Sequence, residues 1–220
     1  MANLGAVWLY LPLENAPGPP TRLIIFDGGV KVDFTICDVM RLSDMARSGV
    51  LPPLYERGYR VLIDKDRLAA RLPRAPLRPP MTLPPSPEEF TKVIREFWFE
   101  VFHVSKYLKR EDLWAAKTRD WQVMQQLLPM LVWYEKSLHG WDYETEPSGV
   151  RMKEWVEPDI QTRLMCAFAS FDAAKSWRAL DVTVRLFRDL AQATAVRLGH
   201  TYPQELDEHI SRYMGFLRGW

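Results

Sequence analysis

The sequence predicts an α+β protein, in which a small β-sheet is followed by a C-terminal bundle of helices. Three observations support this class: an Asp-Gly-Gly turn between two β-rich runs, a proline-dense stretch at residues 72–87, and helical periodicity from there to the end. Proline-dense chain favours neither helix nor central strand. We therefore expect a sheet domain at residues 1–72, a linker at residues 73–87 and a helical domain at residues 88–220.

The sheet domain is expected to contain a β-hairpin. Residues 22–26 are rich in β-branched and aromatic side chains, and an Asp-Gly-Gly turn follows at residues 27–29. An Asp-Gly pair between two such runs is a strong hairpin signal. Apolar and polar side chains then alternate through residues 30–37, which places Asp33 on the face opposite the apolar set. Residues 60–64 predict one further strand.

A long amphipathic helix is predicted at residues 89–117. Its apolar and aromatic residues recur at three- and four-residue steps, and Ser86 with Pro87 marks its start as N-cap and first helical residue. Cationic side chains lie along the flank of the apolar face, where they could receive phosphate or a polyhydroxylated ligand. Further helices are predicted at residues 119–138, 152–156, 158–168, 173–198 and from residue 203 to the C-terminus.

Composition excludes several classes of function. The chain has 29 Lys and Arg against 28 Asp and Glu, so no global charge favours nucleic acid or an acidic membrane surface. No apolar run is long enough to span a bilayer, and no secretory leader is evident, so we expect a cytoplasmic protein. Cys37 and Cys166 lie in apolar sequence and are expected to be reduced core residues. The histidines show no metal-ligand spacing.

A series of motifs in order resembles the aminoglycoside 6-adenylyltransferase (streptomycin adenylyltransferase) family. The motifs are FDGGVKVDFTICDV, RVLIDKD, HVSKYLKRED, LLPMLVWY, GWD, PSG followed by MKEW, and GHTYP, and they extend from about residue 22 onward. The resemblance implies a partial nucleotidyltransferase-type sheet before the linker and a helical substrate- and nucleotide-binding domain after it. It also implies Mg²⁺-dependent transfer of AMP from ATP to a hydroxyl of an aminoglycoside such as streptomycin.

The same resemblance suggests roles for individual residues. Asp33 matches the third metal-binding carboxylate of the family, and is the expected catalytic and metal-binding residue. The Gly-Ser and Asp-x-Asp pattern that supplies the other two carboxylates does not precede it. We therefore expect a family member that lacks its N-terminal part and is catalytically impaired. Lys106, Arg110 and Lys153 are expected to contact the triphosphate, and Glu96, Trp98, Trp141 and Asp142 the aminocyclitol.

Simpler interpretations stay open for each of these residues. Asp33 is also explained as a solvated strand residue, and Lys106 and Arg110 as a solvated helix face paired with Glu111 and Asp112. Most aromatic residues are expected in the core. An alternative function is a non-catalytic binding or interaction module, which keeps the helical domain and forms a homodimer through its incomplete sheet, with residues 7–11 as an exchanged strand.

Overall fold

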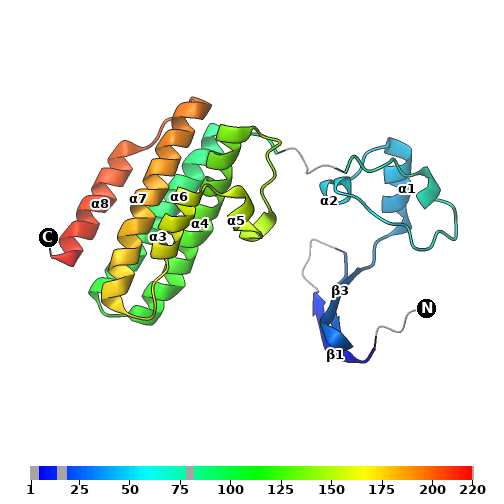
Figure 1. The fold of residues 1–220 in the computed structure, drawn as a ribbon, viewed down its shortest axis with the longest axis horizontal. Coiled ribbons are helices and arrows are strands. Elements are labelled where there is room, and N and C mark those ends of the chain that lie inside the picture. The colour runs from blue at the N-terminus through cyan, green and yellow to red at the C-terminus, as the bar shows by residue number, and fades with distance from the viewer. Residues whose placement is uncertain (1–4, 14–18, 78–81, 220) are drawn as a thin grey trace. The chain divides into compact units, whose positions relative to one another are not determined.

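The computed structural model describes residues 5–13, 19–77 and 82–219, which form two compact units, Met1–Pro80 and Met81–Trp220 (Figure 1). The first unit carries the strands and the second carries the long helices. The α+β class predicted from the sequence is therefore confirmed. The roles assigned to the two domains stay predictions.

A three-stranded antiparallel sheet forms the start of the first unit. Its strands are β1 (Val7–Leu13), β2 (Thr21–Phe26) and β3 (Val30–Thr35), in the order β1-β2-β3. The predicted hairpin is confirmed, because the short turn η1 (Asp27–Gly29) joins β2 to β3. Gly28 and Gly29 both have a φ of 77°, a conformation that glycine adopts without steric cost.

The rest of the first unit contains short helical elements. Asp38 caps α1 (Val39–Ser48) by accepting a 2.8 Å hydrogen bond from the Met40 N–H, and α2 (Pro53–Glu56) and η2 (Ala69–Arg71) follow. The strand predicted at residues 60–64 is wrong, since this segment is irregular and pairs with no strand in the described part of the chain. Its Asp64 side chain instead accepts a hydrogen bond from the Ala70 N–H.

The second unit is a bundle of helices. Helix α3 packs against α4, α7 and α8, and α6 packs against α7. The helices are α3 (Pro87–Lys109), α4 (Leu113–His139), α5 (Met152–Trp155), α6 (Pro158–Ala167), α7 (Ala173–Leu198) and α8 (Gln204–Arg218), with a short turn η3 (Pro147–Gly149) before α5.

Helix α3 begins where the sequence predicts and ends earlier. Ser86 Oγ accepts from the Glu89 N–H, and the Glu89 carboxylate accepts from the Ser86 N–H, which completes a capping box. A single helix over residues 89–117 is wrong, because the chain turns at residues 110–112 and starts α4 at Leu113. Glu111 has a φ of 64°, and the Asp112 N–H donates to the Tyr107 carbonyl. This is a Schellman-type ending with glutamate where glycine is usual.

Aromatic side chains fill the core of the helical unit. The rings of Phe97 on α3 and Phe187 on α7 stack at a centroid distance of 3.6 Å, and Trp98 and Phe90 are fully buried beside them. The prediction that most aromatics are core residues therefore holds for α3. Trp121, on the outer side of α4, is an exception at 58% exposed.

Two predictions about buried and membrane residues have clear outcomes. Cys37 and Cys166 are free thiols, but both are exposed, so their assignment to the core is wrong. In α6 the buried residues are Ile160 and Ala167, a spacing of seven, and Cys166 falls outside that stripe. Among the described helices, none is both long and apolar enough to cross a bilayer.

Candidate functional site

The predicted metal ligand, Asp33, lies exposed on β3. Its carboxylate forms an ion pair with Lys31 at 2.8 Å, and both side chains are about half exposed. Within the described residues, no group of three metal-binding side chains includes Asp33. One carboxylate that is already paired with a lysine does not make a Mg²⁺ site, since this ion takes up several oxygen ligands. Asp33 by itself therefore does not fit the implied metal.

In the helical unit, a groove of about 590 Å³ runs between α3 and the start of α8. Its walls are mainly aromatic and aliphatic, and its charged members are Arg95 and Glu205. A mostly apolar concavity with few charged groups is typical of a ligand site. The groove is lined by Arg95, Trp98, Phe99, Phe102, Pro203, Gln204, Glu205, Leu206 and Ile210.

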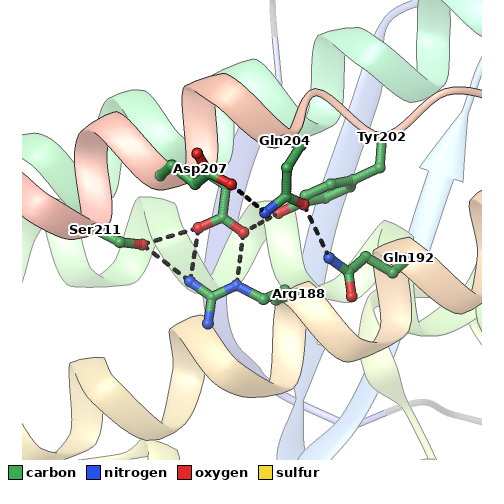
Figure 2. A network of polar contacts seen from close by, with 7 residues as sticks. Arg188, Gln192, Tyr202, Gln204, Asp207 and Ser211 are labelled. Carbon is green, nitrogen blue, oxygen red and sulfur yellow. Dashed lines mark hydrogen bonds and ion pairs between the residues drawn. The ribbon is translucent and has the colours of Figure 1, made fainter.

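A polar network beside this groove ties α7 to α8 (Figure 2). Arg188 on α7 donates two hydrogen bonds of 2.6 Å to the carboxylate of Asp207 on α8. Tyr202 and Ser211 each donate a further bond of 2.8 Å to the same carboxylate. The Asp207 side chain is only 2% exposed, so this bidentate pair fixes the position of α8 on the bundle.

Electrostatics within the network favour one protonation state. Burial would raise the pKa of the Asp207 carboxyl, but hydrogen bonds from Arg188, Tyr202 and Ser211 together hold it below its usual value. Burial, followed by the bond to Asp207, raises the pKa of Tyr202. At neutral pH the network therefore consists of a guanidinium, a carboxylate and a neutral phenol.

The network also supports the floor of the groove. The Arg188 guanidinium carbon lies 5.8 Å from the centre of a Trp98 ring, and Trp98 is one of the residues that line the groove. The Trp98 side chain is fully buried. Trp98 is therefore a packing residue under the groove in this structure.

Glu96 lies on the other side of Arg95 from Trp98. It forms a long ion pair of 3.8 Å with Lys92 and lines a shallow hollow on the first turns of α3, which shares Arg95 with the groove. Two of the four residues predicted to contact the aminocyclitol therefore lie two positions apart on α3, a spacing that turns Glu96 toward the hollow and Trp98 toward the groove.

Lys106 and Arg110 lie near the C-terminal end of the same helix. The Lys106 Nζ sits 5.5 Å from the centre of the Phe102 ring and 5.4 Å from that of Tyr107. Arg110 is exposed and is the last residue before the turn. Cations are favoured here because the helix C-terminus carries a partial negative charge. Phe102 also lines the groove, so Lys106 adjoins its far end.

Trp141, Asp142 and Lys153 lie in the segment between α4 and α6, and none of them lines the groove. Trp141 is half-buried, and its carbonyl accepts hydrogen bonds from Lys136 and from Thr82. Asp142 and Lys153 are exposed. The structure therefore separates the predicted helical-unit residues into two groups, one along α3 and one after α4.

Sequence reasoning missed the Arg188–Asp207 pair and the part of α8 that lines the groove. The two partners are 19 residues apart on different helices, so no local spacing identifies them. The one local signal was the Thr-Tyr-Pro segment before α8, which contains Tyr202.

A small antiparallel sheet followed by a helical bundle is an α+β arrangement of the nucleotidyltransferase type. The structure resembles the crystal structure of an aminoglycoside 6-adenyltransferase from Bacillus subtilis with a TM-score of 0.57 and 20% identity, covering 98% of this chain and 80% of that one. The family model of streptomycin adenylyltransferase matches residues 8–216. The chain belongs to the streptomycin adenylyltransferase family.

A relative from Campylobacter jejuni, an aminoglycoside 6-adenylyltransferase, is 24% identical over 196 residues. The match covers 87% of this chain and 64% of the relative, so the chain spans less than two thirds of that protein's length.

Proposed function

We propose that this chain is an aminoglycoside adenylyltransferase-like protein. The reaction we assign to it is the Mg²⁺-dependent transfer of AMP from ATP to a hydroxyl of an aminoglycoside such as streptomycin. The observation that carries the proposal is the family match over residues 8–216. We assign aminoglycoside binding to the helical unit, where the groove between α3 and α8 provides a concave surface.

The chemistry of the groove suits an aminoglycoside. Such ligands are polyhydroxylated and cationic, so they need carboxylates for their ammonium groups and flat apolar surfaces for their sugar rings. Glu205 lies in the groove and Glu96 in the adjoining hollow, and Phe99 and Phe102 supply the apolar surfaces. Charge-assisted hydrogen bonds of this kind give both affinity and orientation. In this proposal Trp141 and Asp142 contact the aminocyclitol from the segment after α4.

We assign the nucleotide triphosphate to Lys106 and Arg110 near the end of α3, and propose a separate nucleotide contact for Lys153, which lies in the segment after α4. None of the three forms an ion pair within the described residues, which leaves their charges for an anionic ligand. Lysine acts toward phosphate as a point charge, and arginine can donate two parallel hydrogen bonds.

Turnover by this polypeptide is proposed to be impaired. Mg²⁺ would neutralise the triphosphate when bound, but Asp33 alone does not fit it, because Lys31 already pairs with that carboxylate. In this proposal Asp33 contributes one ligand to Mg²⁺ only when other carboxylates complete the metal site.

Binding of the acceptor is tested by calorimetry with streptomycin on the whole chain. Glu205→Gln removes a charge from the groove and is expected to weaken binding about tenfold. Glu208→Gln is the matched control, because Glu208 is on the same helix, exposed, and does not line the groove. Equal affinities for the wild type and Glu205→Gln would place the aminoglycoside elsewhere.

Catalysis is tested separately by pyrophosphate release in the presence of ATP, Mg²⁺ and streptomycin. We expect slow turnover that Asp33→Asn abolishes while streptomycin binding is unchanged. Complete absence of turnover in the wild type would remove the enzymatic part of the proposal and leave the binding part intact.

A second candidate function is a non-catalytic interaction module that dimerises through the sheet. It is favoured by β1, an edge strand whose seven side chains are all exposed, among them Trp8 at 62% and Tyr10 at 55%. An exposed apolar edge strand is a template for pairing with another chain. Light scattering after size-exclusion chromatography distinguishes the candidates, since a strict monomer argues against this one.

A further inference from the structure

Three metal-binding side chains converge where α4 ends and α6 begins. Glu135 and His139 are four residues apart on the last turns of α4, and Glu157 immediately precedes α6. One potential ligand atom from each residue lies within 4.8 Å of the other two. Residues i and i+4 share a helix face, so the first two point in the same direction by construction.

Glu135 provides a second and independent observation. Its side chain is fully buried, and one carboxylate oxygen, Oε1, accepts a 3.0 Å hydrogen bond from the Glu157 N–H. The other oxygen, Oε2, is buried without a hydrogen bond in the described part of the chain. A buried carboxylate oxygen without a hydrogen bond is costly, because only the charge of nearby groups compensates for its lost contact with water. Oε2 faces the imidazole of His139.

One ligand-to-ligand distance in the cluster has the length expected in a small tetrahedral site. His139 Nε2 and Glu135 Oε2 are 3.5 Å apart. With metal–ligand bonds of about 2.0–2.2 Å, two neighbouring ligands of a tetrahedral ion lie about 3.4 Å apart. The bond from the Glu157 N–H also holds the Glu135 carboxylate in one orientation, as outer hydrogen bonds do for metal ligands.

We propose that Glu135, His139 and Glu157 form a site for a divalent transition-metal ion of the Zn²⁺ class. One imidazole and two carboxylates suit Zn²⁺ better than Mg²⁺ or Ca²⁺, which prefer oxygen ligands throughout. His139 is 41% exposed on its side chain, so an ion can reach the site from solvent and keep water as its fourth ligand. This site is separate from Asp33 and does not depend on the proposed adenylyl transfer.

The residues around the proposed metal site are held in place by contacts with one another. The ring of Tyr143 lies against the His139 ring at a centroid distance of 4.6 Å, and the Tyr143 hydroxyl donates to the Trp155 carbonyl. The Lys136 ammonium donates to the Tyr143 carbonyl at 2.6 Å. A bound ion would thus join the end of α4 to the start of α6 without rearranging the segment between them. Besides His139, Arg197 is a cation whose charge acts on Glu135.

The proposal is tested on the full chain after removal of metals with a chelator. Titration with ZnCl₂ followed by calorimetry is expected to give one equivalent bound at micromolar affinity or tighter, with no heat from MgCl₂. His139→Ala and Glu135→Gln are each expected to weaken binding at least tenfold. His209→Ala is the matched control, because His209 is an exposed histidine on α8 away from the site.

Cobalt substitution identifies the ligands directly. The exposed thiols of Cys37 and Cys166 are alternative ligands for such metals, and ligation by either would add a sulfur-to-cobalt charge-transfer band in the near ultraviolet. We expect tetrahedral visible bands without that ultraviolet band, and loss of the visible bands in His139→Ala. Sulfur ligation, unchanged zinc affinity in both His139→Ala and Glu135→Gln, or no zinc binding by the wild type would each overturn the proposal. The wild-type titration stands even if a variant fails to fold.

Discussion

The two units bury their apolar side chains to very different extents. In the helical unit α3 alone buries seven apolar residues, whereas in the first unit the buried hydrophobic side chains are Phe26 and Leu51 within the described residues. Along β1 every side chain is exposed. Burial of apolar surface is the main favourable term in folding, so the helical unit is expected to carry most of the stability of the chain. The sheet unit is held chiefly by its backbone ladder.

The contrast shows how far a helix and a small sheet each depend on other elements to cover their apolar faces. A helix satisfies its backbone internally and needs one apolar face covered, which α4, α7 and α8 do for α3. A three-stranded sheet needs one face covered by another layer. Loss of one core side chain should therefore affect the two units unequally.

The largest effect is expected for Phe97→Ala. Phe97 is fully buried and stacked on Phe187, so its loss should lower the free energy of unfolding by about 3–5 kcal/mol. Trp8→Ala, which removes a larger but 62% exposed side chain from β1, should cost less than about 1 kcal/mol. Urea unfolding compares the two, monitored by helical circular dichroism for Phe97→Ala and by hydrogen exchange of the β1–β2 amide ladder for Trp8→Ala. Similar losses would mean that the first unit has a core of its own.

The next largest effect is expected for Asp207→Asn. The change removes the charge that Arg188 binds through two hydrogen bonds, and should cost about 1–3 kcal/mol, with the partial exposure of Arg188 reducing the loss. Asp189→Asn is a matched control, since Asp189 pairs with Arg163 on the surface. A loss no greater than that of the control would show that α8 is held by apolar contacts alone.

The same pair should make stability depend on pH. Burial would raise the pKa of Asp207, but its hydrogen bonds lower it in the folded state. Its contribution is therefore complete above the unfolded pKa of about 3.9 and is lost as pH falls below about 4, through the folded pKa. Wild type and Asp207→Asn should converge in that acid window when melting temperature is measured against pH. A constant difference down to the lowest pH would contradict the assignment.

A smaller effect is expected for the helix caps. Ser86→Ala removes the capping box of α3 and should cost about 1 kcal/mol in the helical unit. Asp38→Ala removes the side-chain N-cap of α1 in the first unit, and should leave the helical unfolding midpoint unchanged. Equal shifts from both variants in urea unfolding would mean that the two units unfold together.

The smallest effect is expected for Asp33→Asn. The ion pair with Lys31 joins two exposed side chains, so its loss should change stability by no more than about 0.5 kcal/mol. A change above about 1 kcal/mol in the same unfolding experiment would show that Asp33 has a structural role in the sheet.

Local signals predicted much of this fold. The Asp-Gly pair at residue 27 identified the β2–β3 hairpin, Ser86 marked the start of α3, and Gly199 the end of α7, because each of these depends on neighbours in sequence. Residues 60–64 read as a strand by composition, but composition does not provide a partner strand. The turn at Glu111 was missed because it lacks glycine and proline.

The candidate site was predictable only where one helix arranges it. Trp98 lies three residues after Arg95 on α3, so helical geometry places both in the wall of the groove, whereas Glu96 turns to the adjoining hollow. The pairing of Arg188 with Asp207 follows from how α7 and α8 dock, which no local pattern encodes. Glu135 and His139 show the same limit: no metal-ligand spacing was predicted for the histidines, because the approach of Glu157 depends on how the chain folds after α4.

The turn at Glu111 is a position where a substitution is expected to stabilise the protein. A left-handed backbone costs a side-chain-bearing residue about 1–2 kcal/mol. Replacing this glutamate with glycine or asparagine would relieve that conformational penalty at the tip of the α3–α4 hairpin, and such a variant would be a sturdier starting scaffold for altering the residues that line the groove.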